Sequence, residues 1–277
     1  LRLIRFRNQT GTALLLLPVC WALVLAARGL PSWKLFAIFT AGAFLMRSAG
    51  VILNDLADQS FDRRVTRTKS RPLASGELTR PQAFVLLALL LAAAGLLLVF
   101  LNPLTRWLAP IAVALAALYP FAKRFIHIPQ AILGIAFGWG TIMAWTATRN
   151  TVEPQAWIVF AATAVWAIAY DTIYAVQDQE DDRRIGVKSS ALLFGSALWM
   201  AVGLALGTML VLLVLAGRLA DIGWAYYLAL GAVGIFFAVQ SAALRNRVDP
   251  PQAFRMFQAH VWAGAAILAG LVAGFLL

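Results

Sequence analysis

The chain has 277 residues, of which 62% are hydrophobic and only 13% are charged, and its mean hydropathy is +0.80. Soluble domains are about 45–50% apolar and about 25% charged, so this composition excludes an ordinary soluble protein and indicates an integral membrane protein. The formal net charge is +11, but the basic residues stand in short blocks between apolar runs, which is typical of cytoplasmic loops and not of a nucleic-acid-binding surface. The single cysteine, Cys20, cannot form an internal disulfide.

Nine apolar runs are long enough to cross the roughly 30 Å hydrocarbon layer of a bilayer. In lipid each run must satisfy its own backbone hydrogen bonds, so we expect helices. Three arginines before the first run resemble the start of a signal peptide, but the eight later runs favour a retained helix. We predict an all-α polytopic membrane protein, with residues 1–277 as a single domain. The nine runs cover about residues 12–30, 33–53, 82–101, 104–121, 129–148, 156–176, 192–217, 222–243 and 258–277.

Basic residues are unevenly divided between the two sets of connections. The amino-terminal tail has Arg2, Arg5 and Arg7, and the connection over 54–81 has six lysines or arginines. Basic residues mark the cytoplasmic side, so we predict an amino terminus inside and a carboxyl terminus outside. The two longest polar connections, 54–81 and 177–191, both fall on the cytoplasmic side, and long connections are often functional.

A row of polar side chains, NDLADQSFD, directly follows the second apolar run. At helical spacing Asn54, Asp58 and Asp62 are i, i+4 and i+8, so they share one face, with Asp55 beside them. Like charges on one helical face repel each other. A positive partner is therefore expected for this row.

A second acidic row, in YDTIYAVQDQEDDRRIG, follows the sixth run and is also expected to occupy one helical face. Its first member, Asp171, follows the apolar stretch WAIAY at membrane depth. An ionisable group is costly there and indicates function. Glu180 and Asp181, beside the row, are expected to be solvated loop residues. The two rows lie at matching helix ends, which is consistent with two four-helix halves followed by a ninth helix. The members at i, i+3, i+7 and i+11 are Asp171, Tyr174, Asp178 and Asp182.

Converging carboxylates without histidine or cysteine favour a hard cation with oxygen ligands. Mg²⁺ prefers one or two carboxylates, several waters and substrate phosphate oxygens, whereas His127 and His260 are far apart in the sequence and form no zinc pattern. We therefore predict Mg²⁺ and, through it, a bound phosphate group. The predicted metal ligands are Asn54, Asp55, Asp58, Asp62, Asp178 and Asp182.

Basic residues close to the acids in the sequence are candidate ligands of that phosphate. Arg67 and Arg71 follow the first row, and Lys123 and Arg124 follow the fourth run. Arginine and lysine stabilise charge that develops on phosphoryl oxygens. The same residues also fit the positive-inside distribution, and the two roles are compatible.

These residues resemble the UbiA family of intramembrane aromatic prenyltransferases. The family motif N-D-x-x-D-x-x-x-D is matched in full by the first row, and D-x-x-x-D is matched by Asp178 and Asp182. The stretches YDTIYAVQDQEDDRRIGVKSSALLFG and YPFAKRFIHIPQAILGIAFGWG resemble its 4-hydroxybenzoate polyprenyltransferase branch. The amino-terminal piece departs from that branch, because Asn8 and Gln9 stand near its usual Lys-Pro. This departure leaves the role of residues 5–10 open.

The resemblance implies a bundle of nine transmembrane helices around a central cavity, in a bacterial inner membrane with the active site on the cytoplasmic side. The implied reaction is Mg²⁺-dependent transfer of a polyprenyl group from polyprenyl diphosphate to the carbon ortho to the hydroxyl of 4-hydroxybenzoate, in ubiquinone-type quinone biosynthesis. Other acceptors of the family, namely homogentisate, dihydroxynaphthoate, haem and chlorophyllide, stay open. A secondary transporter is the alternative from another class, since repeated halves and intramembrane acids also occur there.

Four residues are candidates for the chemistry of the implied reaction. Asp171, or Asp178 when it is free of metal, would orient the acceptor phenol or take up its proton. Tyr174 would stabilise an allylic cation through its ring, and Tyr119, Phe137 and Trp139 are further aromatic candidates, although Trp139 fits ordinary packing better. Arg47, seven residues before Asn54 on the same face, would bind the benzoate carboxylate or pair with Asp55 or Asp171.

Overall fold

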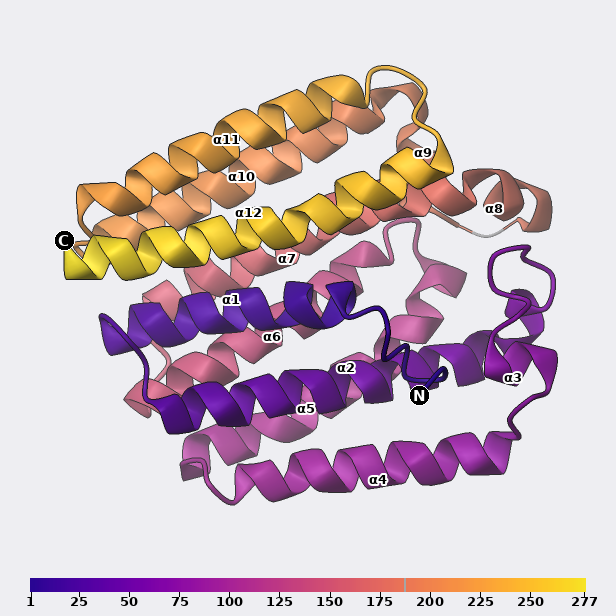
Figure 1. Cartoon of the computed structure of the whole chain (residues 1–277), viewed down its shortest axis with the longest axis horizontal. Coiled ribbons are helices and arrows are strands. Elements are labelled where there is room, and N and C mark those ends of the chain that lie inside the picture. Colours follow the sequence, from indigo (N-terminus) through magenta and orange to yellow (C-terminus); the bar gives the residue numbers. More distant parts are fainter. Residues whose placement is uncertain (187) are drawn as a thin grey trace.

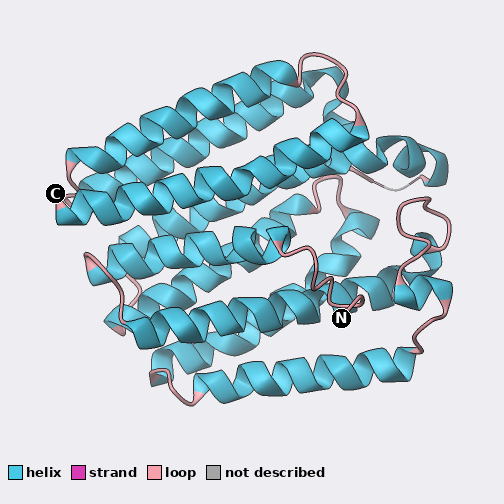
Figure 2. Ribbon diagram, in the orientation of Figure 1, coloured by secondary structure: helices cyan, strands magenta, loops and turns pink. Residues whose placement is uncertain are grey.

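The computed structural model describes residues 1–186 and 188–277, apart from the side chains of Lys123, Arg124 and Ile185. Within these residues it contains helices and loops but no strand (Figure 2). Nine helical segments of this part of the chain are long and apolar enough to cross a membrane, which confirms the predicted fold class. The long helices are α1 (Thr10–Ala27), α2 (Trp33–Asp62), α4 (Arg80–Leu98), α5 (Pro103–Phe125), α6 (Gln130–Arg149), α7 (Pro154–Ala175), α10 (Leu198–Leu219), α11 (Trp224–Ala243) and α12 (Pro250–Leu276).

Two of these helices extend well beyond their apolar runs, both toward polar sequence. Helix α2 continues to Asp62, so the first acidic row is the last part of a membrane helix and not a loop. Helix α12 begins at Pro250, where the Asp249 carboxylate accepts a hydrogen bond of 2.7 Å from the Gln252 backbone nitrogen. A proline at the first helical position and an acidic N-cap both favour a helix start, and these local signals lie before the apolar run that was used to predict the helix.

The second acidic row does not occupy one unbroken α-helical face, which corrects the prediction from spacing. Helix α7 ends at Ala175, a 3₁₀ turn η1 covers Val176–Asp178, and α8 covers Gln179–Ile185. A 3₁₀ turn changes the angular step between residues, so the i, i+7 and i+11 positions no longer follow a 3.6-residue period. The seventh run is interrupted in the same way, as α9 (Ser190–Phe194), η2 (Gly195–Ala197) and then α10.

Small residues allow helices α6 and α7 to pack with their backbones close together. A Cβ atom built on Gly134 would lie 2.4 Å from the carbonyl oxygen of Ala164, and one on Gly138 would lie 2.9 Å from the carbonyl oxygen of Phe160. In membranes such close approach supplies the van der Waals contact that apolar association otherwise lacks. Helices α6 and α7 are therefore in close backbone contact along this part of the bundle.

The carboxyl ends of α2 and α7 reach the same end of the bundle, where the amino terminus, α3 (Pro72–Ser75) and α8 also lie, at the right of Figure 1. The carboxyl terminus of the chain lies at the opposite end. The helix order alone does not bring the two acidic rows together. Their meeting results from the way in which α2 and α7 cross the bundle.

Replacing Gly134 with alanine is expected to lower the thermal stability of the protein in detergent, because the added Cβ atom meets backbone atoms that cannot move aside as a side chain can. Overpacking of this kind costs typically about 1–3 kcal/mol. Gly207→Ala in α10 is the matched control, since a Cβ there meets no atom within 4 Å. Equal unfolding midpoints for the two variants would contradict the close α6–α7 contact.

Candidate active site

A cavity of about 1220 Å³ opens among helices α1, α2, α4, α5, α6, α7 and α12. Side chains such as Leu91, Leu98 and Val113 line one part of it, and acidic and basic side chains line another. The two acidic rows, whose nearest members Asp62 and Asp171 are 109 residues apart in the sequence, face this same cavity. The row members that line it are Asn54, Asp58, Asp62, Asp171, Tyr174, Asp178 and Asp182.

Two members of the first acidic row, Asp58 and Asp62, are buried, and Asp62 is paired with an arginine. Asp58 is 2% exposed and Asp62 is 7% exposed. The Asp62 carboxylate accepts a hydrogen bond of 2.8 Å from Nη1 of Arg71. The repulsion expected along the helical face is therefore offset at Asp62 by a positive side chain from the following connection, as the spacing required.

Asp55 occupies a different position from the rest of its row. It is 1% exposed and does not belong to the cavity lining. Its Oδ1 atom accepts hydrogen bonds from Nη2 of Arg5 at 2.8 Å and from Nη1 of Arg71 at 3.1 Å. A carboxylate so placed fixes two guanidinium groups, and its predicted role as a metal ligand stays a prediction.

The second acidic row is joined to the first connection by Arg67. The guanidinium of Arg67 donates to both carboxylate oxygens of Asp178, with 2.8 Å between Nε and Oδ1. It also donates from Nη1 to the Tyr174 hydroxyl at 2.9 Å. Burial alone would lower the pKa of Arg67, but the hydrogen bond to Asp178 and the nearby Tyr174 raise this pKa above its usual value. Arg67 is therefore a permanent positive charge that bridges the two halves of the site.

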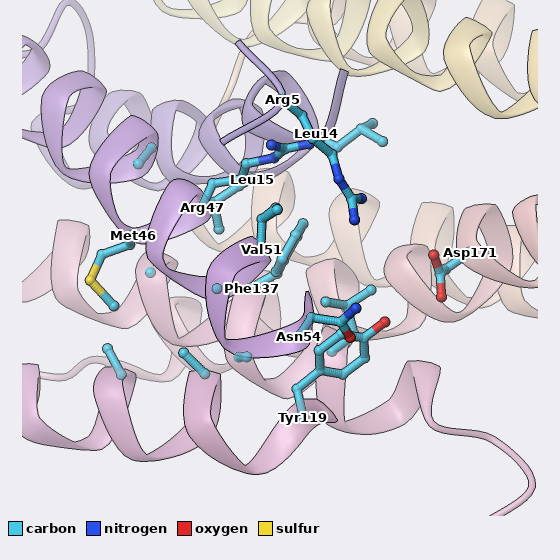
Figure 3. A pocket seen from close by; sticks show the side chains of 18 of the residues that line it. Arg5, Leu14, Leu15, Met46, Arg47, Val51, Asn54, Tyr119, Phe137 and Asp171 are labelled. Carbon is cyan, nitrogen blue, oxygen red and sulfur yellow. The ribbon is translucent and has the colours of Figure 1, made fainter. Parts of the chain in front are cut away.

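Arg47 projects into the cavity from the middle of α2 (Figure 3). Its Nη1 atom donates to the backbone carbonyl of Ile4 at 3.1 Å. A Cβ on Gly11 would lie 3.1 Å from the Arg47 Nε atom, so this glycine leaves room for the guanidinium. Among the ion pairs of the described side chains none involves Arg47, and the alternative pairing with Asp55 or Asp171 is not seen.

Several residues of the site were missed by reasoning from the sequence. Arg5 lines the cavity although residues 5–10 depart from the family pattern. Phe254 and Phe257 reach the cavity from α12 and contact the Tyr174 ring, with centroid distances of 6.3 and 4.8 Å. Their signal was available in the Asp249 N-cap and the following proline, which extend α12 toward the site.

Other predicted residues divide into two groups. Tyr119 and Phe137 line the cavity, whereas Trp139 packs away from it and donates to the Leu108 carbonyl at 2.9 Å. The side chains of Lys123 and Arg124 lie outside the described part of the chain. Packing is thus the observed role of Trp139, as was preferred from the sequence.

Within the described residues, 1–186 and 188–277, no three side chains of aspartate, glutamate, histidine or cysteine lie close enough together to hold a metal ion. Asp62 and Asp178 are instead engaged by arginines. The donor set still has the chemistry that Mg²⁺ requires, since all candidates other than Asp55 offer oxygen to one cavity, namely Asn54, Asp58, Asp62, Asp178 and Asp182. These two arginines offset part of the negative charge that a bound cation would otherwise neutralise.

Comparison with known proteins gives concordant results for sequence and fold. The model of the UbiA prenyltransferase family matches residues 15–275. The 4-hydroxybenzoate octaprenyltransferase of Pseudomonas aeruginosa (strain LESB58) is 44% identical over 276 residues, covering 100% of this chain and 93% of that protein. The enzyme of the same name from Cupriavidus necator H16 is 44% identical over 274 residues, covering 99% of this chain and 96% of that protein.

Solved structures agree on the fold. A UbiA homolog from Aeropyrum pernix K1 superposes with a TM-score of 0.80 at 23% identity, covering 94% of this chain and 97% of that one. A UbiA homolog from Archaeoglobus fulgidus bound to GPP and Mg²⁺ has a TM-score of 0.69 at 17% identity, covering 100% of this chain and 99% of that one. The extent of the family match and the identity to its curated members lead to one conclusion: this chain belongs to the UbiA prenyltransferase family.

Proposed function

We propose that this protein transfers a polyprenyl group from polyprenyl diphosphate to the ring carbon ortho to the hydroxyl of 4-hydroxybenzoate, in ubiquinone-type quinone biosynthesis. The curated relatives that are 44% identical over nearly the full chain are named for this acceptor. The observation that carries the proposal is the convergence of two distant acidic rows on one cavity that is otherwise largely apolar. The protein is an integral membrane protein, and we place its site on the cytoplasmic side of a bacterial inner membrane.

The cofactor that we propose is Mg²⁺, with one ion held by Asn54, Asp58 and Asp62 and a second held by Asp178 and Asp182. A divalent cation would supply Lewis acidity to the leaving diphosphate. The Archaeoglobus fulgidus homolog whose structure contains GPP and Mg²⁺ is consistent with this choice. The five side chains all line the cavity and offer oxygen ligands only.

Arg67 and Arg71 would bind the diphosphate. Each now holds a cavity carboxylate, Asp178 and Asp62 respectively, so each already lies beside the acids that the metal needs. When a diphosphate arrives, the guanidinium groups can donate to its oxygens instead and leave the carboxylates available. We extend the same role to Lys123 and Arg124.

The apolar part of the cavity would receive the polyprenyl tail and keep water from the reacting carbon. In the reaction the bond between the first prenyl carbon and the diphosphate oxygen breaks, and the electron pair leaves with the diphosphate. The rings of Tyr174 and Phe257, 4.8 Å apart between centroids, would stabilise the allylic cation by about 2 kcal/mol or more when desolvated. Tyr119 would contribute from the opposite helix α5.

The acceptor ring then forms a carbon–carbon bond through the carbon ortho to its phenol and loses the proton from that carbon. Asp171 faces the cavity from α7 and would orient the phenol or accept the proton. Asp178 could take this role only in the part of the cycle in which it holds neither metal nor Arg67. Arg47 would bind the carboxylate of 4-hydroxybenzoate.

The direct test is a transfer assay with the purified protein in lipid vesicles. It contains Mg²⁺, one polyprenyl diphosphate, and 4-hydroxybenzoate in parallel with homogentisate and dihydroxynaphthoate. We expect prenylated 4-hydroxybenzoate, and we expect its formation to stop when EDTA removes divalent ions and to resume when Mg²⁺ is restored. Preference for another acceptor, or undiminished turnover in EDTA, would overturn the acceptor or the metal proposal respectively. Uptake of solute without prenylation would instead indicate the transporter alternative.

A further inference from the structure

The amino-terminal residues 1–9, which we call the strap, lie beside the cavity and are held by contacts at several points. Leu3 is 2% exposed and packs in a cluster with Ile52 of α2 and Leu87 of α4. Arg2 donates to Glu77 at 2.7 Å, and the Phe6 ring meets the Phe44 ring edge-on at 6.1 Å. The strap is therefore a fixed part of the wall and not a loose tail.

Two residues of the strap, Arg5 and Asn8, line the cavity, and Arg5 is the charged one. Arg5 has a φ of 52°, a left-handed conformation that is uncommon for a residue with a side chain. Its Nη2 atom donates to the buried Asp55, which also receives Arg71. A guanidinium has five N–H donors, so this ion pair anchors Arg5 and leaves donors for a ligand.

Arg5 and Arg47 reach the cavity from the same part of its wall (Figure 3). The carbonyl that Arg47 binds belongs to Ile4, the residue directly before Arg5, so the strap holds the two arginines together. Arg47 lies seven residues before Asn54 in α2, which is about 10 Å along the helix axis, on the side away from Asp62. Arg47 thus stands apart from Arg67 and Arg71, which lie at the acidic end. Arg5 connects the two regions, because it shares the Oδ1 atom of Asp55 with Arg71.

We propose that Arg5 and Arg47 together form the seat of the acceptor carboxylate, with the strap placing Arg5 and Asp55 holding it there. This inference rests on the proposed function and names a further residue that determines which acceptor binds. Arg5 shares the single carboxylate of Asp55 with Arg71, and among the ion pairs of the described side chains none involves Arg47. Arg5 and Arg47 therefore retain positive charge for an anionic acceptor. A neutral acceptor has no carboxylate to which the guanidinium groups of Arg5 and Arg47 could donate.

The test compares Arg5→Gln and Arg5→Lys with wild type, and Arg7→Gln serves as matched control. Arg7 is in the same strap, is exposed and does not line the cavity. The KM values for 4-hydroxybenzoate, for its methyl ester and for the polyprenyl diphosphate are measured, together with calorimetric binding of 4-hydroxybenzoate without donor. We expect Arg5→Gln to raise the KM and the dissociation constant for 4-hydroxybenzoate by roughly 10- to 100-fold, and Arg5→Lys to recover part of this loss.

The remaining arms separate the possible explanations. The KM for the ester should change by less than about twofold in Arg5→Gln, since no carboxylate is present, and Arg7→Gln should behave like wild type. Equal losses for the acid and the ester would show a structural role and overturn the inference, as would an increase confined to the KM for the diphosphate. If wild type prenylates 4-hydroxybenzoate but Arg5→Gln does so unchanged, only this inference fails. If wild type neither binds nor prenylates it, the proposed function fails as well.

Discussion

Asp178→Asn and Asp58→Asn are each expected to reduce prenyl transfer by about 100-fold or more, with the protein still folded in the membrane. Both side chains line the cavity, on opposite acidic rows. An amide offers a neutral oxygen in place of a carboxylate, so it binds a divalent cation weakly and does not offset Arg67. Losing one preorganised electrostatic contact to a developing charge costs about 10²- to 10³-fold. The measurement is kcat at saturating substrates over a titration of Mg²⁺.

Asp181→Asn is the matched control for this pair of variants. It changes the same functional group in the same acidic stretch, but Asp181 does not line the cavity, and we expect near wild-type turnover. Both cavity variants should also require more Mg²⁺ for half-maximal activity. Wild-type turnover in Asp178→Asn or Asp58→Asn, at ordinary Mg²⁺, would remove the metal assignment.

Arg71→Met is expected to lower both stability and activity. Arg71 is the shared partner of Asp55 and Asp62, whose side chains are 2% and 9% exposed. Removing one partner of a buried ion pair leaves an uncompensated charge and typically costs about 3–5 kcal/mol. The midpoint of thermal unfolding in detergent should fall, and diphosphate binding should weaken because a proposed ligand is lost.

Arg2→Met provides the contrast for the effect on stability. Its pair with Glu77 is largely exposed, with side-chain exposures of 65% and 50%, and such pairs contribute about 0–1 kcal/mol. Adding Asp62→Asn to Arg71→Met should restore part of the stability without restoring transfer, because Asp62 loses its ion pair with Arg71, whereas Asp55 keeps Arg5. An Arg71→Met variant as stable as Arg2→Met would contradict the buried network.

The amino-terminal strap contains a contact, between Arg5 and Asp55, that sequence motifs did not predict. Residues 5–10 depart from the family pattern at Asn8 and Gln9, and the departure left their role open. In the structure the neighbouring Arg5 pairs with Asp55, fifty positions further along the chain. A side chain whose partner is so distant leaves no periodic signal in its own segment.

The sequence by itself determined the membrane class, the number of spans and the first acidic row. Apolar runs of about 20 residues form transmembrane helices in lipid, because the backbone N–H and C=O groups must form their hydrogen bonds within each run. The spacing of Asn54, Asp58 and Asp62 needed only the helical period, and all three do line the cavity. The second row was found by its composition, although the turn at Val176–Asp178 breaks the period from which its geometry was predicted.

Only the tertiary structure decided which residues share the cavity and which partners hold them. It separated Asp55 from its row, joined Arg67 to Asp178 across the bundle, and brought Arg5 beside Arg47. Periodicity describes positions within one helix, whereas these contacts depend on how α2, α7 and the strap cross, and that is fixed by packing such as the backbone contact at Gly134. Local sequence therefore specifies the elements and their polar faces, and long-range packing specifies the chemistry that those faces form together.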